Sequence, residues 1–356
     1  MKIILFTDSL GAGGAQRQLV GLAVMLKNIK HEVKVCTYHN IDFYKSYLDE
    51  NHVKNELIQN ADDPKKRIFS VFRYLKKESP NYVIAYQETP SLIACLCKIL
   101  GCKYKLIVSE RNTTQYIGLK EKVRFFLYRW ANDIVPNSYS QEKFLLSHYT
   151  WMKNKVTTIS NFVDLDKFSF SNKIKSGIPI IVVAATIWHS KNTKGLIKAV
   201  KILAEKQMVF KIKWYGIIND YKEYLEECLE LIRLYKLQDY IELLPKTKQI
   251  HEKYAECDFF CLPSFYEGTP NVICEAMACG RPILCSNVCD NSIYVKEDSN
   301  GFLFNPNNPI DIASKIQKAL DLNDMEYQKM CKCSRERANS MLSENLFLSK
   351  YIKILK

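Results

Sequence analysis

The sequence Phe259-Phe-Cys-Leu262-Pro-Ser-Phe-Tyr-Glu267-Gly-Thr-Pro-Asn-Val-Ile-Cys-Glu275-Ala-Met-Ala-Cys-Gly280-Arg-Pro-Ile-Leu-Cys-Ser286 predicts a strand, a loop, a helix and a second strand. Thr269 suits the N-cap and Pro270 the first helical position, while Gly280 and Pro282 stop the helix, which should run from about 270 to about 279. The apolar runs 259–262 and 282–286 fit buried parallel strands. The segment therefore predicts a parallel sheet covered by helices.

Two carboxylates surround the start of this helix. Glu275 lies in an apolar run, where an unpaired charge is costly to bury, so it needs a partner or a function. Helical side chains lean toward the helix N-terminus, which directs Glu275 toward the loop that holds Glu267. The N–H groups and the dipole at this end favour a phosphate or a polar sugar. The alternative is a structural glutamate bonded to a neighbouring loop.

Strands and helices alternate along the whole chain. In the first part we expect strands at 2–7, 32–37, 82–86, 105–109, 133–137 and 156–160. After the polar stretch 161–177, we expect strands at 178–185, 210–216, 240–244, 259–262 and 282–286 and helices at 192–206, 221–235, 249–256 and 270–279. This pattern predicts the α/β class with two doubly wound, Rossmann-like domains, each built on a parallel sheet.

The predicted domains are residues 1–165 and residues 166–340, followed by a C-terminal helix, 341–356, that packs back on the first domain. Ligands of doubly wound sheets bind at the carboxyl ends of the strands. We therefore expect a ligand cleft where the two domains face each other.

The composition is that of a globular protein with 356 residues, 47% of them hydrophobic and 25% charged. No apolar run approaches the length of a membrane span, and the first strand becomes acidic too soon for a signal peptide, so we expect a cytoplasmic protein. The thirteen cysteines are scattered and mostly lie in apolar segments, which favours small buried side chains over disulfides. Cys331-Lys-Cys333 lacks partners at zinc-site spacing.

The formal net charge of +13 predicts anionic partners. Segment 119–131 places apolar residues at helical spacing with basic residues between them, and segment 65–77 is similar. The apolar positions are Leu119, Val123, Phe126, Leu127 and Trp130, and the basic ones are Lys120, Lys122, Arg124 and Arg129. Such helices can lie on an anionic membrane surface, and the alternative is a core-facing helix with a solvated basic back. No motif for nucleic-acid binding accompanies the charge.

The loop Gly11-Ala-Gly-Gly14 follows the first strand and opens a helix, so its backbone can approach a ligand closely. Gln16 occupies the third position of a dinucleotide-binding glycine motif, and no acidic residue for a ribose follows the second strand. These two departures disfavour a nicotinamide-dependent enzyme.

Five segments together resemble the retaining glycosyltransferases of the GT-B fold, in the large family 4 that includes bacterial polysaccharide and lipopolysaccharide transferases. They extend over nearly the whole chain. The segments are the glycine loop with Gln16-Arg17, residues 159–168, Lys191-Asn192, residues 258–264, and the two glutamates with Glu-Ala-Met-Ala-Cys-Gly280. The spacing of the two glutamates and the helix after it are the specific elements.

The resemblance implies a role for each donor-site residue. Glu275 would bind the ribose hydroxyls of a nucleotide-sugar, and Glu267 would bind the transferred sugar or stabilise its developing positive charge. Lys191, next to Asn192, would neutralise the diphosphate, helped by the amides of Gly13 and Gly14 across the cleft. The backbone that would hold sugar and phosphate belongs to Gly268, Thr269, Pro270, Asn271 and Val272. Such a site needs no metal or other cofactor, because the lysine and the helix dipole supply the positive charge.

The chain departs from the family at two places. Thr186 stands where many members have an arginine that binds the diphosphate, so Arg111 or another basic group would have to replace it. Where many members have a cleft histidine, this chain has Glu110 and Arg111, which are candidates for contact with the acceptor or the reacting sugar; the alternative is that they pair with each other. Glu88 is a further acceptor-site candidate.

The resemblance thus implies a hexosyltransferase or N-acetylhexosaminyltransferase that uses a nucleotide-sugar, with UDP the expected nucleotide, and acts with retention on a saccharide or lipid-linked glycan. We expect it in the cytoplasm or at the inner face of the cell membrane. Two alternatives remain open, a nucleotide-sugar epimerase of the same fold and a non-catalytic glycan-binding protein.

Overall fold

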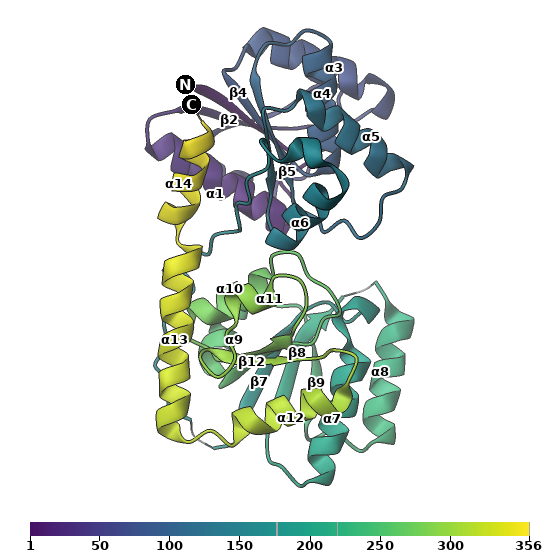
Figure 1. The fold of residues 1–356 in the computed structure, drawn as a ribbon, viewed down its shortest axis with the longest axis vertical. Coiled ribbons are helices and arrows are strands. Elements are labelled where there is room, and N and C mark those ends of the chain that lie inside the picture. Colours follow the sequence, from purple (N-terminus) through teal and green to yellow (C-terminus); the bar gives the residue numbers. More distant parts are fainter. Residues whose placement is uncertain (176, 219, 356) are drawn as a thin grey trace. The chain divides into compact units, whose positions relative to one another are not determined.

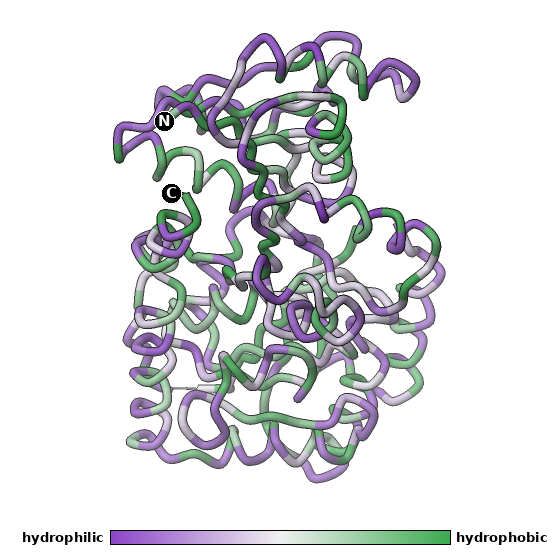
Figure 2. Tube along the Cα trace, turned by 45° about the horizontal axis from the view of Figure 1, so that its top comes forward, coloured by the Kyte–Doolittle hydropathy of each residue, from purple (hydrophilic) through white to green (hydrophobic). Residues whose placement is uncertain are grey.

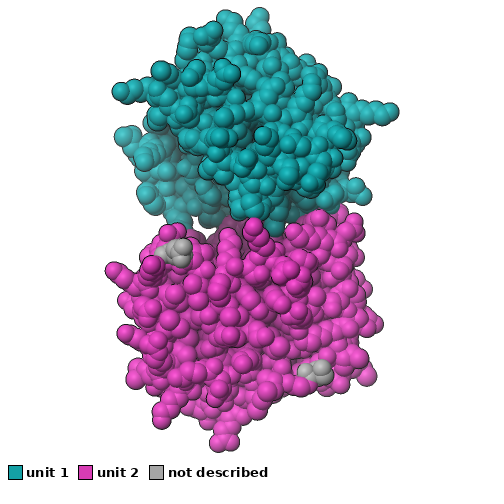
Figure 3. All heavy atoms as spheres, turned by 180° about the vertical axis from the view of Figure 1, so that it is seen from behind, with its two compact units in different colours: residues 1–162, 344–356 teal, residues 163–343 magenta. Residues whose placement is uncertain are grey.

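The computed structural model describes residues 1–175, 177–218 and 220–355 and divides into two compact units (Figure 3). Unit 1 comprises Met1–Phe162 and Glu344–Lys356, and unit 2 comprises Val163–Ser343. The first predicted domain ended at residue 165. Each unit is an α/β layer structure of the predicted class, and each is described by itself.

Unit 1 is built on a six-stranded sheet with the order β3-β2-β1-β4-β5-β6, in which every pair of neighbours is parallel (Figure 1). The strands are β1 (Lys2–Phe6), β2 (Glu32–Thr37), β3 (Lys54–Leu57), β4 (Tyr82–Tyr86), β5 (Lys105–Glu110) and β6 (Asp133–Pro136). This order places the topological switch point between β1 and β4, where ligands of doubly wound sheets bind.

Alternate side chains of these strands enter two different cores, because successive side chains in a strand point to opposite faces. Ile3 and Leu5 pack with α1 and α14, whereas Ile4 and Phe6 pack with the helices of the other face. The helices are α1 (Gly14–Asn28), α2 (Lys45–Glu50), α3 (Pro64–Glu78), α4 (Glu88–Ile99), α5 (Leu119–Leu127), the 3-10 helix η1 (Tyr128–Trp130), α6 (Tyr139–His148), η2 (Thr150–Met152) and α14 (Glu344–Ile354). Strands that are apolar on both faces thus explain why both faces are covered.

Unit 2 repeats this arrangement with a parallel sheet of order β12-β11-β10-β7-β8-β9. Its strands are β7 (Ile180–Ala184), β8 (Lys211–Ile217), β9 (Ile241–Pro245), β10 (Phe259–Leu262), β11 (Ile283–Ser286) and β12 (Gly301–Phe304). Its helices are η3 (His189–Lys191), α7 (Thr193–Glu205), α8 (Lys222–Leu234), α9 (Ile250–Glu256), α10 (Asn271–Ala278), α11 (Asn291–Tyr294), α12 (Pro309–Leu320) and α13 (Asp324–Leu342). Here the switch point lies between β7 and β10.

The sequence missed some elements and overcounted one. The edge strands β3 and β12 were not predicted, and neither were α12 and α13. The strand predicted at 156–160 is wrong, because only an isolated bridge joins Val156 to Ile134. The helix predicted from Thr269 as N-cap begins one position later, with Pro270 as the N-cap of α10.

The helix α14 belongs to unit 1, although it lies at the far end of the chain. It is amphipathic (Figure 2), and its buried residues Phe347 and Tyr351 pack into the core between α1 and the sheet. The hydroxyl groups of Tyr351 and Tyr86 are hydrogen-bonded at 2.8 Å. Among the described residues, no helix is both long and apolar enough to cross a membrane.

Candidate active site

The switch point of unit 2 brings two of the predicted site residues together. Lys191 lies in the loop that follows β7, and Glu267 lies in the loop that follows β10, the neighbouring strand. The N–H of Phe265 donates a hydrogen bond to the carbonyl of Ser190 at 2.9 Å, which joins the two loops through their backbones. Two loops at adjacent carboxyl ends therefore position this pair.

Lys191 and Glu267 form an ion pair, with Nζ and Oε1 2.6 Å apart. The side chains keep 27% and 12% of their exposure, so the pair is partly buried but still reachable by a ligand. An ammonium group has three donors, and one is used here. The remaining donors can bind anionic oxygens without breaking this contact.

Glu275 lies one turn into α10 and is 4% exposed. The hydroxyl of the buried Tyr254, on α9, lies 3.5 Å from its Oε2. Gly280 has φ +76 and ends the helix as predicted; the N–H groups of Gly280 and Arg281 bond the carbonyls of Met277 and Ala276 in a Schellman arrangement. The helix is thus fixed at its end, and Glu275 is buried in the middle of it.

The other predicted donor residues divide between loop and helix. Gly268 and Thr269 lie in the loop before α10, and Asn271 and Val272 form its first turn. Asn192 differs from its prediction, because its buried side-chain amide donates to the carbonyl of Pro306 at 2.8 Å and fills the space beside Gly195. Its side chain therefore takes part in the packing of unit 2, and the contribution of Asn192 to a donor site stays a prediction.

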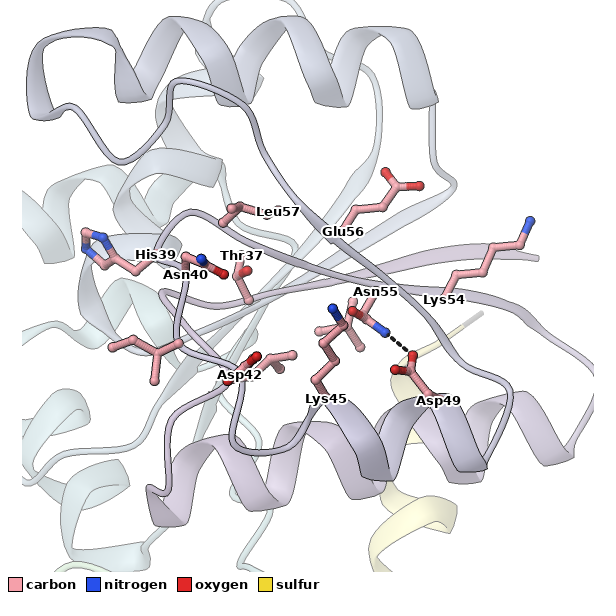
Figure 4. A pocket seen from close by; sticks show the side chains of 13 residues that line it. Thr37, His39, Asn40, Asp42, Lys45, Asp49, Lys54, Asn55, Glu56 and Leu57 are labelled. Atoms are coloured by element: carbon pink, nitrogen blue, oxygen red, sulfur yellow. Dashed lines mark hydrogen bonds between the residues drawn. The ribbon is translucent and has the colours of Figure 1, made fainter.

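A hollow of about 430 Å³ lies in unit 1 at the end of β2 and beside β3 (Figure 4). Polar groups from His39, Asn40, Asp42 and Lys45 line it, and the amide of Asn55 donates to Asp49 at 2.7 Å along its wall. This hollow could not be predicted from the sequence, because β3, which forms one wall, was not predicted.

A second hollow, of about 580 Å³, adjoins the loop of Lys191 in unit 2. It is lined by His189, Lys194 and Lys198 together with aromatic side chains, among them Trp188 and Tyr224. The sequence offered no reason to assign a role to His189. The centroid of its ring lies 4.1 Å from that of Tyr224. The spacing of Lys194 and Lys198 on α7 was the sequence signal for this basic wall.

The glycine loop of unit 1 leads from β1 into α1, with Gly13 as the N-cap. Gln16 donates from its side chain to Asp8 at 3.0 Å, and a Cβ at Gly13 would meet the Gln16 side-chain oxygen at 2.2 Å. Gln16, which stands in place of a third glycine, thus links the start of α1 to Asp8 at the start of the loop and packs against Gly13. The contribution of Gly13 and Gly14 to a donor site stays a prediction.

Glu110 and Glu88 are joined through Arg124, not through Arg111. Arg124, on α5, contacts Oε1 of Glu88 at 2.6 Å and Oε2 of Glu110 at 3.6 Å, and the Tyr128 hydroxyl donates to Glu110. Glu110 is fully buried, and this burial raises its pKa against the opposing attraction of Arg124. The prediction that Arg124 belongs to an exposed basic face is wrong, since it is 3% exposed. The side chain of Glu88 is 45% exposed, although its partner Arg124 is buried.

Arg111 is fixed inside unit 1. Its guanidinium donates to Asn161 at 3.0 Å and to the Tyr351 hydroxyl at 2.8 Å, and it lies 4.2 Å over the ring of Tyr86. The alternative that Glu110 and Arg111 pair with each other is wrong. Arg111 ties α14 to the sheet, and its contact with an acceptor stays a prediction.

The acidic pair Asp164-Leu-Asp166 has a local role in the turn it occupies. Oδ1 of Asp164 accepts the N–H groups of Asp166 and Lys167 at 3.2 and 2.9 Å. In the described part of the chain, no three His, Cys, Asp or Glu side chains are grouped so that they could hold a metal ion. All thirteen cysteines are free, and eleven of them are buried.

Residues 164–337, which contain Lys191 and both glutamates of the site, match the model of the family described as glycosyl transferases group 1. The chain is a glycosyltransferase. It is 26% identical over 353 residues to an alpha-1,4-N-acetyl-D-galactosaminyltransferase of Campylobacter jejuni, covering 92% of this chain and 91% of that protein. It is 24% identical over 282 residues to an alpha-1,3-galactosyltransferase of Escherichia coli, covering 73% of this chain and 70% of that protein. It is therefore an enzyme that transfers a glycosyl group.

Solved glycosyltransferases have the same fold. A glycosyltransferase of Rickettsia africae matches with a TM-score of 0.87 and 20% identity over 100% of this chain and 99% of that one. HepE of Anabaena matches with a TM-score of 0.86 and 17% identity over the same shares of the two chains. These matches confirm the predicted GT-B fold.

Proposed function

We propose that this enzyme transfers a sugar from a UDP-sugar to a saccharide acceptor carried on a lipid, with retention of anomeric configuration. The observation that carries the proposal is the Lys191–Glu267 ion pair in the loops that follow β7 and β10, together with the buried Glu275 on α10, the helix that follows the Glu267 loop. The lysine and the helix N-terminus suit a phosphate, and the two carboxylates suit a sugar and a ribose.

The similar proteins support this choice of donor and acceptor. The name of the Campylobacter relative includes a saccharide linked to PP-undecaprenol, and that of the Escherichia relative includes UDP-Gal and GlcNAc-diphosphoundecaprenol. The Anabaena structure contains UDP. These names support the choice of a UDP-sugar as donor and of a lipid-linked saccharide as acceptor.

The proposed reaction breaks the bond between the sugar C1 and the β-phosphate oxygen and forms a bond between C1 and the acceptor oxygen. Lys191 stabilises the negative charge that develops on the leaving diphosphate, and Glu267 stabilises the positive charge that develops at the sugar. The acceptor proton moves to the leaving phosphate, on the face of the sugar from which that phosphate departs. Glu275 holds the ribose hydroxyls, which fixes the donor without taking part in bond changes.

Glu88 is the proposed acceptor ligand of unit 1, since its exposed carboxylate is held in place by the buried Arg124. Glu110, which shares Arg124 with Glu88, and the neighbouring Arg111 are the other proposed residues of the acceptor site. Metal-independent catalysis is part of the proposal, because Lys191 and the α10 dipole supply the positive charge. So is a peripheral position at the inner face of the membrane, where a lipid-linked acceptor would lie.

The test combines donor binding with transfer. The protein is screened against nucleotide-sugars by thermal shift, since a ligand that binds only the native state raises its melting temperature. The best donor is then used with a diphospholipid-linked saccharide, with and without a chelator. Lys191→Ala and Glu275→Ala should each lower kcat/KM by about 10²-fold or more. The matched controls are Lys253→Ala and Glu256→Ala, which remove a surface ion pair on α9.

Each outcome has a defined meaning. Unchanged transfer in both site variants contradicts the site assignment, and loss of activity with a chelator contradicts metal independence. Turnover of the donor sugar without an acceptor would indicate the epimerase alternative. Binding of a glycan with no transfer from any donor would indicate the non-catalytic alternative. Retention is read from the anomeric configuration of the product by NMR.

A further inference from the structure

The helix α5 turns a stripe of large apolar side chains toward solvent. Leu119, Val123, Phe126 and Trp130 recur at helical spacing along α5 and η1 and are 79%, 47%, 55% and 38% exposed. The core is contacted by the opposite face, through Phe125, Leu127 and Tyr128. The core-facing alternative is therefore wrong for these four residues and holds for Leu127, and no described part of unit 1 buries the four.

Basic side chains flank the stripe on both sides. Lys120, Lys122 and Arg129 are exposed, and none of them forms an ion pair among the described residues. The acidic residue of the helix is Glu121. Its carboxylate caps the N-terminus of α5 by accepting the N–H of Gly118 at 3.0 Å. The Arg129 guanidinium lies 5.6 Å over the ring of Phe126. The exposed charges of α5 and η1 that have no ion-pair partner among the described residues are thus those of Lys120, Lys122 and Arg129, and all three are positive.

The neighbouring helices have the same character. On this face of the sheet α4 packs against both α3 and α5. Ile68 and Phe69 of α3 are 40% and 62% exposed, and basic residues surround them in the sequence. These basic residues of α3 are Lys65, Lys66, Arg67, Arg73, Lys76 and Lys77.

We propose that α5, with α3 on the other side of α4, docks unit 1 on an anionic lipid bilayer. Aromatic and aliphatic side chains on one helix face, with lysine and arginine on its flanks, are the pattern of helices that lie in the membrane interface. A second copy of this chain is a poor occupant, because it would bring the same three unpaired cations against each other. The complementary surface must be both anionic and apolar, as a bilayer of anionic lipids is.

The docking helix also reaches the proposed acceptor residues. Its buried face carries Arg124, which holds Glu88 and Glu110. Contact with the bilayer would therefore place the edge of unit 1 that holds Glu88 close to lipid-linked substrates. This second step rests on the proposed function, whereas bilayer docking itself does not.

The experiment measures flotation of the full-length protein with vesicles of phosphatidylglycerol and phosphatidylcholine, compared with phosphatidylcholine alone. Binding should require the anionic lipid and weaken as salt is raised. Lys120→Glu with Lys122→Glu, and separately Leu119→Ser with Phe126→Ser, should each lower the partition coefficient by about tenfold or more. Matched controls in unit 2 are Lys329→Glu with Lys332→Glu and Leu234→Ser with Ile310→Ser, all at exposed positions.

A second readout locates the contact. Trp130 fluorescence should be quenched by brominated acyl chains, and Trp130→Phe should remove most of the quenching. Equal binding to neutral vesicles, unchanged binding in both α5 variants, or self-association in place of vesicle binding would overturn the proposal. Since flotation uses neither donor nor acceptor, and transfer to a lipid-free saccharide needs no vesicle, failure of this proposal is distinguishable from failure of the proposed function.

Discussion

Lys191 and Glu267 illustrate how a single pair of residues can be both a structural contact and a catalytic device. Their ion pair is partly buried and, at 2.6 Å, is short. Pairs of this exposure contribute little to stability, because solvent screens the attraction and the side chains lose entropy. Their more valuable property is preorganisation, since a lysine already held beside the diphosphate position need not reorganise during the reaction.

The substitution Glu267→Gln tests whether the charge of Glu267 preorganises Lys191 for catalysis. The amide keeps the size of the side chain but removes the charge that holds Lys191 and that would stabilise the sugar cation. We expect kcat to fall by about 10²-fold or more while the free energy of unfolding changes by about 1 kcal/mol or less. Steady-state kinetics and urea unfolding measure the two quantities.

The matched control is Glu256→Gln, which removes the carboxylate of an exposed pair with Lys253. It should leave both kcat and stability nearly unchanged. A large loss of stability in Glu267→Gln with an unchanged kcat would assign the pair to structure alone.

At the residue scale the sequence predicted what local rules govern. Gly280 was identified as the helix stop because glycine adopts the positive φ that ends many helices. Glu275 was identified because a carboxylate is conspicuous in an apolar run. Arg124 was wrongly predicted to lie on an exposed basic face. Its partners Glu88 and Glu110 lie on other elements, and a local sequence pattern does not predict such a long-range pair.

Three elements of unit 1 meet at one carboxylate. Oε2 of Glu78, the last residue of α3, lies 2.9 Å from Lys2 on β1 and 3.0 Å from Lys34 on β2. The hydrogen bonds from Lys2 and Lys34 lower the pKa of Glu78. This carboxylate therefore joins the end of α3 to the first two strands.

Glu78→Gln should reduce the pH dependence of stability. A lowered pKa in the folded state means that the stabilisation is present above the ordinary pKa of 4.5 and is lost as pH falls through the folded-state pKa. We expect the variant to be less stable by about 1 kcal/mol or less at pH 7, and the difference to shrink toward zero by about pH 3. Urea unfolding between these pH values measures it.

The exposed Glu32, at the start of β2, provides the control Glu32→Gln, for which no such trend is expected. A difference between Glu78→Gln and the parent that stays constant with pH would contradict the role of the charge.

Elements were predictable in proportion to how fully they are buried. The central strands β1, β4, β7 and β10 are continuous apolar runs, and all four were predicted. β3, with the sequence Lys-Asn-Glu-Leu, is a partly exposed edge strand that has no such run. The stripe on α5 shows the converse, since periodicity identified the helix but could not tell a core face from a membrane face.

The whole molecule uses one sheet topology twice. Numbered from the first strand of its own unit, each sheet has the order 3-2-1-4-5-6, and each places its candidate site at the carboxyl ends of the strands at its switch point. The repetition was predictable, since the alternation of strands and helices restarts after the polar stretch 161–177. The sequence also led us to expect that the helix at 341–356 packs back on the first domain, and α14 does join the core of unit 1, although the rest of that core is formed by residues more than a hundred positions away in sequence.

Unit 1 should therefore depend for its stability on the opposite end of the chain. Phe347 is 2% exposed, and its ring centroid lies 4.9 Å from that of Phe162 and 5.1 Å from that of Tyr351. Phe347→Ala should cost about 3–5 kcal/mol, the usual range for a buried phenylalanine. Because these contacts lie within unit 1, hydrogen exchange should accelerate in β1 and β4 and remain slow in β10 and β11. Ile352→Ala, at a 44% exposed position of the same helix, should leave exchange in both units unchanged. Equal acceleration in both units after Phe347→Ala would mean that they unfold as one cooperative body, and protection of β1 and β4 that is unchanged would mean that α14 is dispensable for the core it covers.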